Sequence, residues 1–546
     1  MIAPRIAAAL ALFTLTAATG EPARFADFAY QGRSPGAAKP KAGEYANPIL
    51  SGYYPDPSVL RVGEDYYLAL SSFAHFPGIP IFHSRDLIHW TQIANAIDRP
   101  TQLNLAGRRA SQGVFAPDIS WHAGTFYIAN TCVECGGNFV ITAKDPRGPW
   151  SDPVWLPFEG IDPSIHWEGD RAWIVNNRAP PGPPRYDGHR AIWIQEYDWR
   201  AGRMVGDATL LLDGGVDPAR NPVWIEGPHI LKKDGWYYLL AAEGGTSVHH
   251  SQVALRARTL LGPYLPDPAN PILTQRDLSD DRPHPITSAG HAKLVQTQRG
   301  DWWATFLAVR PYAGDYYNTG RETFLLPVRW QDGWPVILPK GQAIPTALPA
   351  PRLPRGAAPR QPTSGDFGYV DRFDGRSLDL GWIGLRNPTR PFYHLKDGEL
   401  ILDGGAPLGD QSGVPGFVGR RQQHAVATVH TTLRFVPEAD DDRAGLAAIQ
   451  SDASYLFFGL TRIAGRTAIA LYTRAKGDER LVASAPLTAD GPVTLTLRID
   501  RDRMGFDYRV DGRSATLAEG VDARFLSTHD AGGFTGTVIG PYSWRR

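Results

Sequence analysis

Five short aromatic segments recur along the amino-terminal part of the chain and constrain its fold more than any other feature. Each is apolar, has the length of one β-strand and follows a turn that carries Gly or charged residues. Their separations run from the high forties to the mid sixties, with no convincing long helical period between them. The segments are Tyr66-Tyr67-Leu68, Phe126-Tyr127-Ile128, Trp173-Ile174-Val175, Trp236-Tyr237-Tyr238 and Trp302-Trp303-Ala304. Units of about sixty residues predict a five-bladed β-propeller with one four-stranded sheet in each unit.

A polar residue lies about ten positions before each aromatic segment, and the series reads Asp56, Asp118, Asp162, Glu226 and His291. In a propeller the innermost strand of each unit lines a central channel, so residues at equivalent positions face one cavity. Carboxylates held close together raise one another's proton affinity. Such clusters usually bind metals or carry acid–base chemistry. Asp118 also suits a turn cap.

Three of these acids are the residue types that glycoside hydrolysis needs. One acid protonates the leaving oxygen, a second activates water or attacks carbon, and a third raises the pKa of the proton donor. Glu226, Asp56 and Asp162 suit these jobs. A metal site made of the three acids and His291 is the main alternative. A structural role also stays open, because Asp-Pro-Ser forms a good turn.

Composition and the amino-terminal residues limit the possible partners and the cellular location of the protein. The chain has 56 Lys+Arg and 56 Asp+Glu, and this balance argues against nucleic acid or an anionic membrane surface as the main partner. Residues 1–20 carry one positive charge, an apolar run and small residues, which is typical of a secretory signal peptide. The apolar run is too short to span a membrane comfortably. We therefore expect an exported, periplasmic or secreted protein, in which Cys132 and Cys135 form a local disulfide or stay as free thiols.

The residue composition of the chain changes after the fifth aromatic unit. Residues 344–364 are rich in Pro and predict a semi-rigid, extended linker. Residues 365–546 contain strand-like runs separated by Asp-Gly turns, which predict a two-sheet β-sandwich. The expected chain is therefore all-β, with a propeller over 45–343 and a sandwich over 365–546.

Several segments carry a family resemblance. They read Asn-Pro-Ile-Leu-Ser-Gly-Tyr-Tyr-Pro-Asp-Pro-Ser at 47–58, Ser-Ser-Phe-Ala-His-Phe-Pro-Gly-Ile-Pro-Ile-Phe-His-Ser-Arg-Asp-Leu-Ile-His-Trp at 71–90, Gly-Ile-Asp-Pro-Ser at 160–164, Glu-Gly-Pro-His at 226–229, Gly-His-Ala at 290–292 and Gly-Arg-Glu-Thr-Phe-Leu at 320–325. In this order they resemble glycoside hydrolase family 43. Gly-Arg-Arg-Gln-Gln-His at 419–424 and Gly-Phe-Thr-Gly-Thr-Val at 533–538 resemble the concanavalin-like sandwich attached to β-xylosidases of that family.

The resemblance implies a five-bladed propeller and an inverting mechanism. Asp56 would be the general base that activates water, and Glu226 the general acid that protonates the leaving sugar oxygen. Asp162 would hold Glu226 in place and raise its pKa. Inversion requires room for a water molecule, so the Asp56 and Glu226 carboxyl groups are expected about 6.5–9.5 Å apart.

The resemblance also implies a set of substrate-binding residues. Arg321 would contact the sugar in the innermost subsite, either pairing with Asp162 or bridging sugar hydroxyls with its planar fork. Phe73 would form an apolar wall, and Phe115 stands where the family often has Trp. His291 would support the floor of the site on the propeller axis. A buried ion pair for Arg321 and plain packing for the two Phe residues are the structural alternatives.

No cofactor is expected for the reaction, and no residue is assigned as a metal ligand. In the family the axial histidine sometimes acts through a calcium ion or water, so a structural calcium ion near His291 stays open. Lys293 stands where the family commonly has Asp, which puts one supporting interaction in doubt. Residues 176–189 are Pro-rich and unlike close relatives, so they are a candidate for setting substrate choice at the rim.

The sequence therefore predicts an exo-glycosidase that removes β-1,4-linked xylose from the non-reducing ends of xylo-oligosaccharides. The attached sandwich favours exo-action, because in such relatives it closes one side of the pocket. The nearest alternative is an α-L-arabinofuranosidase, or an enzyme with both activities. A non-catalytic carbohydrate-binding protein is a rival from another class, and the presence of all three carboxylates argues against it.

Overall fold

The chain folds almost entirely into β-strands in the computed structural model, which describes residues 20–279, 281–488 and 491–546. The expected all-β class is confirmed. The helical segments in the described ranges are short: η1 (Pro218–Arg220), η2 (Arg524–Leu526) and α1 (Thr528–Ala531). Within those ranges we find no helix with the length and apolar character that crossing a membrane requires. The predicted signal peptide lies outside the described residues, apart from Gly20.

The amino-terminal part forms a series of antiparallel sheets whose strands follow the chain order. Their strands are β4 (Ser58–Val62), β5 (Asp65–Ala69), β7 (Gly78–Ser84) and β8 (Thr91–Ile97); β10 (Asp118–His122), β11 (Thr125–Val133), β12 (Gly137–Ala143) and β13 (Val154–Leu156), with β9 (Gly113–Val114) on β11; β14 (Ile161–Glu168), β15 (Arg171–Arg178), β16 (Ala191–Asp198) and β17 (Arg203–Asp213); β18 (Glu226–Lys233), β19 (Trp236–Glu243), β20 (Ser251–Ala257) and β21 (Leu265–Pro266), with β22 (Leu273–Thr274) on β20; and β23 (Thr287–Gln296), β24 (Trp302–Val309), β25 (Glu322–Gln331) and β26 (Trp334–Val336).

The first strands of these sheets lie next to one another in a closed cycle. Strand β4 contacts β10, β10 contacts β14, β14 contacts β18, β18 contacts β23, and β23 contacts β4 again. Apolar side chains fill the space between successive sheets, and the last sheet packs on the first through Trp303 and Leu325 against Leu68 and Phe82. The predicted aromatic segments therefore lie on second strands, where their side chains build the cores between sheets.

The pairing register shows which residues of the first strands are equivalent. Ser58 lies opposite Ala69, and the equivalent residues of the other sheets lie opposite Ala129, Val175, Leu240 and Thr305, each at the end of the aromatic segment or one or two residues beyond it. The equivalent set is Ser58, Asp118, Ser164, His229 and Lys293. Because adjacent strand residues face opposite sides, these side chains share one layer along the common axis.

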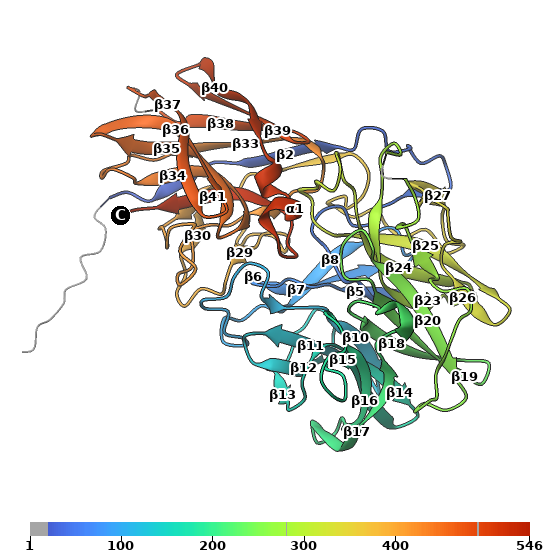
Figure 1. Ribbon diagram of the computed structural model, residues 1–546. Coiled ribbons are helices and arrows are strands. Elements are labelled where there is room, and N and C mark those ends of the chain that lie inside the picture. Colours follow the sequence, from blue (N-terminus) through green and yellow to red (C-terminus); the bar gives the residue numbers. More distant parts are fainter. Residues whose placement is uncertain (1–19, 280, 489–490) are drawn as a thin grey trace, which may run out of the picture.

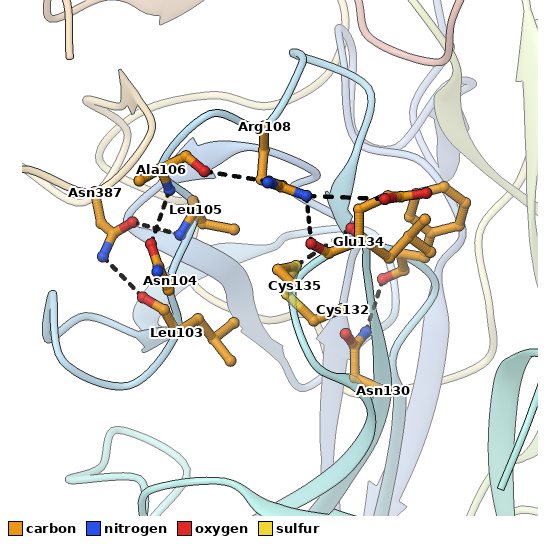
Figure 2. The surroundings of a disulfide bond; sticks show 12 residues. Leu103, Asn104, Leu105, Ala106, Arg108, Asn130, Cys132, Glu134, Cys135 and Asn387 are labelled. Atoms are coloured by element: carbon orange, nitrogen blue, oxygen red, sulfur yellow. Dashed lines mark hydrogen bonds and ion pairs between the residues drawn. A yellow bond between two sulfur atoms is a disulfide. The ribbon is translucent and has the colours of Figure 1, made fainter. Parts of the chain in front are cut away.

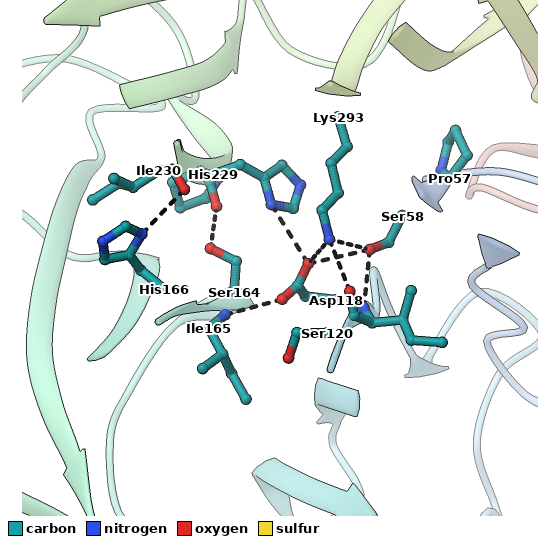
Figure 3. A network of polar contacts seen from close by, with 12 residues as sticks. Pro57, Ser58, Asp118, Ser120, Ser164, Ile165, His166, His229, Ile230 and Lys293 are labelled. Atoms are coloured by element: carbon teal, nitrogen blue, oxygen red, sulfur yellow. Dashed lines mark hydrogen bonds and ion pairs between the residues drawn. The ribbon is translucent and has the colours of Figure 1, made fainter. Parts of the chain in front are cut away.

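Lys293 connects three sheets in this axial layer (Figure 3). Its ammonium group donates to Ser58 Oγ at 2.9 Å, to the carbonyl oxygen of Ile119 at 2.9 Å and to the Asp118 carboxylate. Asp118 also accepts the Ser58 hydroxyl at 3.1 Å and the Ile165 N–H at 3.0 Å. All three protons of the ammonium group therefore have acceptors, so this buried charge is paired and hydrogen-bonded.

The remaining strands form two large sheets that pack face to face at the other end of the molecule (Figure 1). One contains β30 (Tyr393–Lys396), β31 (Glu399–Leu402), β1 (Ala23–Phe25), β33 (Val426–Arg434), β38 (Val493–Asp500), β39 (Arg503–Val510) and β40 (Arg513–Asp522), with β2 (Phe28–Arg33) between β28 (Phe367–Asp371) and β33. The other contains β32 (Arg420–Arg421), β41 (Val538–Trp544), β34 (Arg443–Ser451), β35 (Ser454–Ile463), β36 (Arg466–Ala475) and β37 (Asp478–Pro486). Buried side chains of both sheets share one core.

Two strands of this carboxy-terminal part come from the start of the chain. Strand β1 pairs with β31 and β33, and β2 pairs with β28 and β33. The blue β2 runs among the orange strands in Figure 1. Phe25 and Phe28 are fully buried in the shared core. Residues 23–33, which the sequence left without a domain, therefore complete the second domain.

The Pro-rich linker lies along the first domain. Within it, β27 (Ala347–Pro349) pairs with β3 (Glu44–Ala46), and the Gly356 N–H donates to Asp86 Oδ2 at 2.7 Å. A further short pairing, between β6 (His75–Phe76) and β29 (Gly384–Leu385), joins the two domains directly. The contacts fix how the second domain sits over the first.

Cys132 and Cys135 form a disulfide across the turn between β11 and β12 (Figure 2). The Arg108 guanidinium donates to the carbonyl oxygen of Glu134 inside this turn. The end of β11 also holds Phe115, since the Asn130 side chain donates to the Phe115 carbonyl oxygen at 2.7 Å. Of the two redox states left open by the sequence, the structure has the disulfide.

Replacing Lys293 by Met tests the axial layer. We expect the free energy of unfolding to fall by about 3–5 kcal/mol, because Asp118 would stay buried without a cation. Urea unfolding followed by tryptophan fluorescence measures the change. The control is the double variant Lys293→Met/Asp118→Asn, in which the amide oxygen still accepts the Ile165 N–H and no buried charge remains. A double variant that is no more stable than Lys293→Met would contradict the ion-pair explanation.

Candidate active site

Left-handed backbone residues begin the first strands and turn side chains into one cavity. Asp56 has φ 56°, Asp162 has φ 54° and His291 has φ 51°. At Asp162 and His291, as at Gly227 with φ 57°, the strand pairing shifts register, which is the signature of a β-bulge. A bulge re-aims the local side chain, and non-glycine residues in this conformation concentrate at functional sites.

This geometry corrects the equivalence expected from spacing. The left-handed position is occupied by Asp56, Asp162 and His291 in three sheets and by Gly227 on β18. Glu226 therefore lies one residue before this position. Asp118 lies two residues after the corresponding position and belongs to the axial layer with Lys293. Spacing from the aromatic segments does not reveal these offsets of one and two residues. A bulge adds a residue to the first strand, whereas the aromatic segment on the second strand stays in place. A side chain on Gly227 would collide with the His291 ring, 2.7 Å from its Nε2.

The structure brings all the predicted site residues to one cavity of about 270 Å³. Strands of several sheets and one loop of the second domain line it. The lining residues are Asp56, Phe73, Phe115, Ala116, Ile161, Asp162, Val223, Trp224, Glu226, Gly245, Thr246, His291, Arg321 and Phe534. The volume is below the range of pockets that hold drug-sized molecules, so the cavity suits one small ring.

Asp56 is held from two sides at the bottom of the cavity. The Ser71 hydroxyl donates to Asp56 Oδ2 at 2.5 Å, and Arg321 Nη1 lies 3.3 Å from Asp56 Oδ1. His291 Nδ1 lies 3.6 Å from the same Oδ1. Arg321 was expected to pair with Asp162 or bridge sugar hydroxyls; its ion-pair partner is Asp56, and Nη1 also donates to Thr246 Oγ1 at 3.0 Å.

The other two acids have raised pKa values. Burial raises the pKa of Glu226 well above its ordinary value, and the charges of Asp162 and Asp56 raise it further. Burial raises the pKa of Asp162 to about 6, and the backbone N–H of Gly227, which donates to Asp162 Oδ2 at 3.2 Å, opposes this rise. These surroundings favour the protonated form of Glu226, because burial and the negative charges of Asp162 and Asp56 oppose its ionisation. One proton donor beside one anion is the arrangement that acid catalysis needs.

Three Phe rings form the apolar wall opposite the acids. The Phe73 ring lies 5.1 Å from that of Phe115 and 5.7 Å from that of Phe534, measured between centroids. The Arg321 guanidinium carbon lies 5.7 Å from the Phe73 centroid and 5.2 Å from the Phe534 centroid. Phe534 comes from the second domain, so that domain closes one side of the cavity.

The surroundings of His291 suit a calcium ion poorly. Calcium takes six to eight oxygen ligands, whereas this ring packs against Gly227 and has the cationic Arg321 and Lys293 nearby. In the described ranges no three His, Cys, Asp or Glu side chains are grouped to hold a metal ion. The calcium ion stays a prediction, and the donors present do not fit it.

Four residues of the site were missed by the sequence reasoning. Ser71 and Phe534 lie inside segments that carried the family resemblance, but the resemblance assigned no role to either residue. Thr246 gives no such signal. Trp224, two residues before Glu226, interacts with the Glu226 carboxyl through its side chain.

Comparison with known proteins agrees with this geometry. Residues 45–335 match Glycosyl hydrolases family 43, and residues 370–546 match the beta xylosidase C-terminal concanavalin A-like domain. A xylosidase/arabinosidase of Butyrivibrio fibrisolvens is 37% identical and covers 91% of this chain and 95% of its own. A non-reducing end α-L-arabinofuranosidase of Bacteroides ovatus is 36% identical and covers 91% of each chain. The solved structure of a xylan β-1,4-xylosidase from Bacillus halodurans C-125 has a TM-score of 0.82 at 33% identity, covering 92% of this chain and 96% of that one. The chain therefore belongs to glycosyl hydrolase family 43.

Proposed function

We propose that the first domain is a five-bladed β-propeller and the second a concanavalin-like β-sandwich. The closed cycle of contacts from β4 through β10, β14, β18 and β23 back to β4 supports the propeller. Two sheets that share one core support the sandwich. The reacting groups then lie at the end of the propeller axis where the first strands begin, and the sandwich covers part of that end.

The proposed activity is hydrolysis of terminal β-1,4-linked xylosyl residues from xylo-oligosaccharides. One observation carries it: three buried carboxylates, two with raised pKa values, line a cavity with room for one small ring. Phe534 of the second domain closes one side of the cavity, which favours binding of a chain end and hence exo-action.

Each acid has a separate job in the proposed inverting reaction. Glu226 gives its proton to the leaving oxygen, and Asp56 takes a proton from the attacking water. Asp162 keeps the pKa of Glu226 high through its negative charge. Arg321 and Ser71 fix the orientation of Asp56, and Arg321 contacts the sugar hydroxyls. Phe73 and Phe115 provide the apolar wall for the ring, with His291 below. Two carboxyl groups on opposite sides of the anomeric carbon suit inversion if a water fits between them.

Xylose is the favoured sugar, and arabinofuranose is the second candidate. The family match of the second domain names β-xylosidase, and the similar structure is a xylan β-1,4-xylosidase. The first similar relative is named for both sugars and the second for α-L-arabinofuranose. The apolar walls suit the compact xylopyranose ring, which carries no exocyclic hydroxymethyl group, better than arabinofuranose.

The setting of the enzyme is also a proposal. We propose that it is exported to the periplasm or secreted, supported by the apolar amino-terminal run and by the Cys132–Cys135 disulfide. We propose that hydrolysis needs no metal, because the protein's own Arg321 supplies a cationic group beside Asp56 in the cavity.

A substrate panel tests the proposed activity. We expect higher kcat/KM on aryl β-xyloside and xylobiose than on aryl α-L-arabinofuranoside, and release of xylose only from chain ends. The rates should not change after dialysis against EDTA. Proton NMR of the first product should show the α-anomer of xylose. Faster arabinose release would move the assignment to the second candidate, and a β-anomer product would exclude inversion.

Replacing Glu226 by Gln tests the acid. Because the amide has no proton to give, kcat/KM on xylobiose should fall by about 10²–10⁴-fold. An aryl xyloside with a good leaving group needs little protonation and should lose much less. Asp56→Asn is the matched variant, and it should lose activity on both substrates alike. Equal losses on both substrates for Glu226→Gln would contradict the acid role.

The pH profile of Asp162→Asn tests the electrostatic role of Asp162. The Asp162 charge raises the pKa of Glu226, so removing that charge lowers this pKa. Because the reaction needs protonated Glu226, the basic limb of kcat/KM should move to lower pH. The profile is measured on xylobiose between pH 4 and 10, with Asp170→Asn, an exposed acid outside the cavity, as control. An unmoved basic limb would limit Asp162 to a structural role.

A further inference from the structure

Trp224 has an unusual backbone for a bulky residue beside the acid. Its φ of 57° lies in the left-handed region, which large side chains rarely adopt. Backbone hydrogen bonds hold the segment before Glu226 at Trp224 and at the preceding residue, Val223. The Trp224 N–H donates to the Gly188 carbonyl oxygen at 2.8 Å, and the Val223 carbonyl oxygen accepts the Gly244 N–H at 2.8 Å. Such strain persists only where the surroundings impose it, and it concentrates at functional sites.

The Trp224 side chain lies between the cavity and the protein rim. Its indole forms part of the cavity lining and interacts with the Glu226 carboxyl. On its other side the guanidinium carbon of Arg190 lies 4.0 Å from the centroid of the indole ring. A cation over the face of Trp is the strongest of the cation–aromatic pairs, so Arg190 restricts where the ring can sit.

Both contacts come from residues 179–190, which we call the rim segment; it overlaps the Pro-rich residues 176–189 of the sequence analysis and extends one residue further, to Arg190. The rim segment is held down by polar contacts. The Tyr186 hydroxyl donates to the carbonyl oxygens of Gly214 and Pro222, both at 3.0 Å. Asp213 pairs with His189 at 2.8 Å and with Arg185 at 3.1 Å. The rim segment and the residues that lead to Trp224 therefore form one fixed unit.

We propose that Trp224 is a positioning residue for Glu226 and that the rim segment sets the place of Trp224 through Gly188 and Arg190. This inference rests on the proposed function, in which Glu226 is the acid. The indole side chain interacts with the Glu226 carboxyl and lines the same cavity, and holding that carboxyl keeps its proton aimed at the leaving oxygen. A rim segment that differs between relatives would thereby change the leaving groups that are accepted without altering any of the three acids.

Trp224→Phe tests the proposal, because Phe keeps the ring and removes the N–H. We expect kcat on xylobiose to fall roughly tenfold, with KM little changed, which is the size of one hydrogen bond. An aryl xyloside with a good leaving group should lose less than threefold. The indole favours the ionised form of Glu226, so its loss should move the basic limb of kcat/KM to higher pH. Trp121→Phe, on a Trp that is 43% exposed, is the control and should match the unmodified enzyme.

Arg190→Met and Arg190→Lys provide a second test that leaves the cavity lining intact. The Met variant should show a smaller loss with the same dependence on the leaving group, and the Lys variant, which keeps a cation over the ring, should recover most of it. If Trp224→Phe does not fold, this pair of Arg190 variants decides the question.

Equal losses on both substrates with an unmoved basic limb would overturn the positioning role. If Glu226→Gln is selectively impaired while the Trp224 and Arg190 variants behave like the unmodified enzyme, only this inference fails. If Glu226→Gln keeps full activity, the proposed function fails first.

Discussion

The site depends on one backbone device, the left-handed residue that begins a first strand. At this point Asp56 and Asp162 turn into the cavity, and two residues later Ser58 and Ser164 turn into the axial layer below. Side chains two residues apart on a strand face the same side. The backbone conformation at one residue therefore sets the direction of the side chains in both layers. The upper layer can then hold groups that react, while the lower layer, with Lys293 at its centre, holds the sheets in place.

The buried charges are distributed so that the acids differ from one another. Arg321 lies against Asp56, and Lys293 lies one layer down against Asp118. Glu226 has no ion-pair partner within 4 Å among the described residues, and the nearby anions raise its pKa. Acids whose surroundings push their pKa values apart take different roles in one reaction. Burial and the placement of the cationic groups therefore set the acids apart, although the three acids come from similar sequence contexts.

The recurring aromatic segments made the larger features of the fold predictable. They mark second strands, whose side chains face both neighbouring cores, so their period survives variable loops. The two amino-terminal strands were not predictable in the same way. Strand β1 has three residues, and its partners in β31 and β33 are more than 370 residues away along the chain. A strand that short carries no alternation of its own, and only pairing with these distant strands on both sides selects it.

The site was predictable where chemistry lies in local motifs and unpredictable where it depends on packing across the molecule. Asp56, Asp162 and Glu226 stand in recognisable turns, whereas Phe534 becomes part of the cavity through contact between the two domains, where Gly320 lies against Gly536. A Cβ on Gly320 would lie 2.8 Å from the Gly536 backbone, so any side chain there would push the Phe534 loop outwards. The closed end of the cavity, on which exo-action depends, is therefore a property of the domain contact and not of the catalytic domain alone.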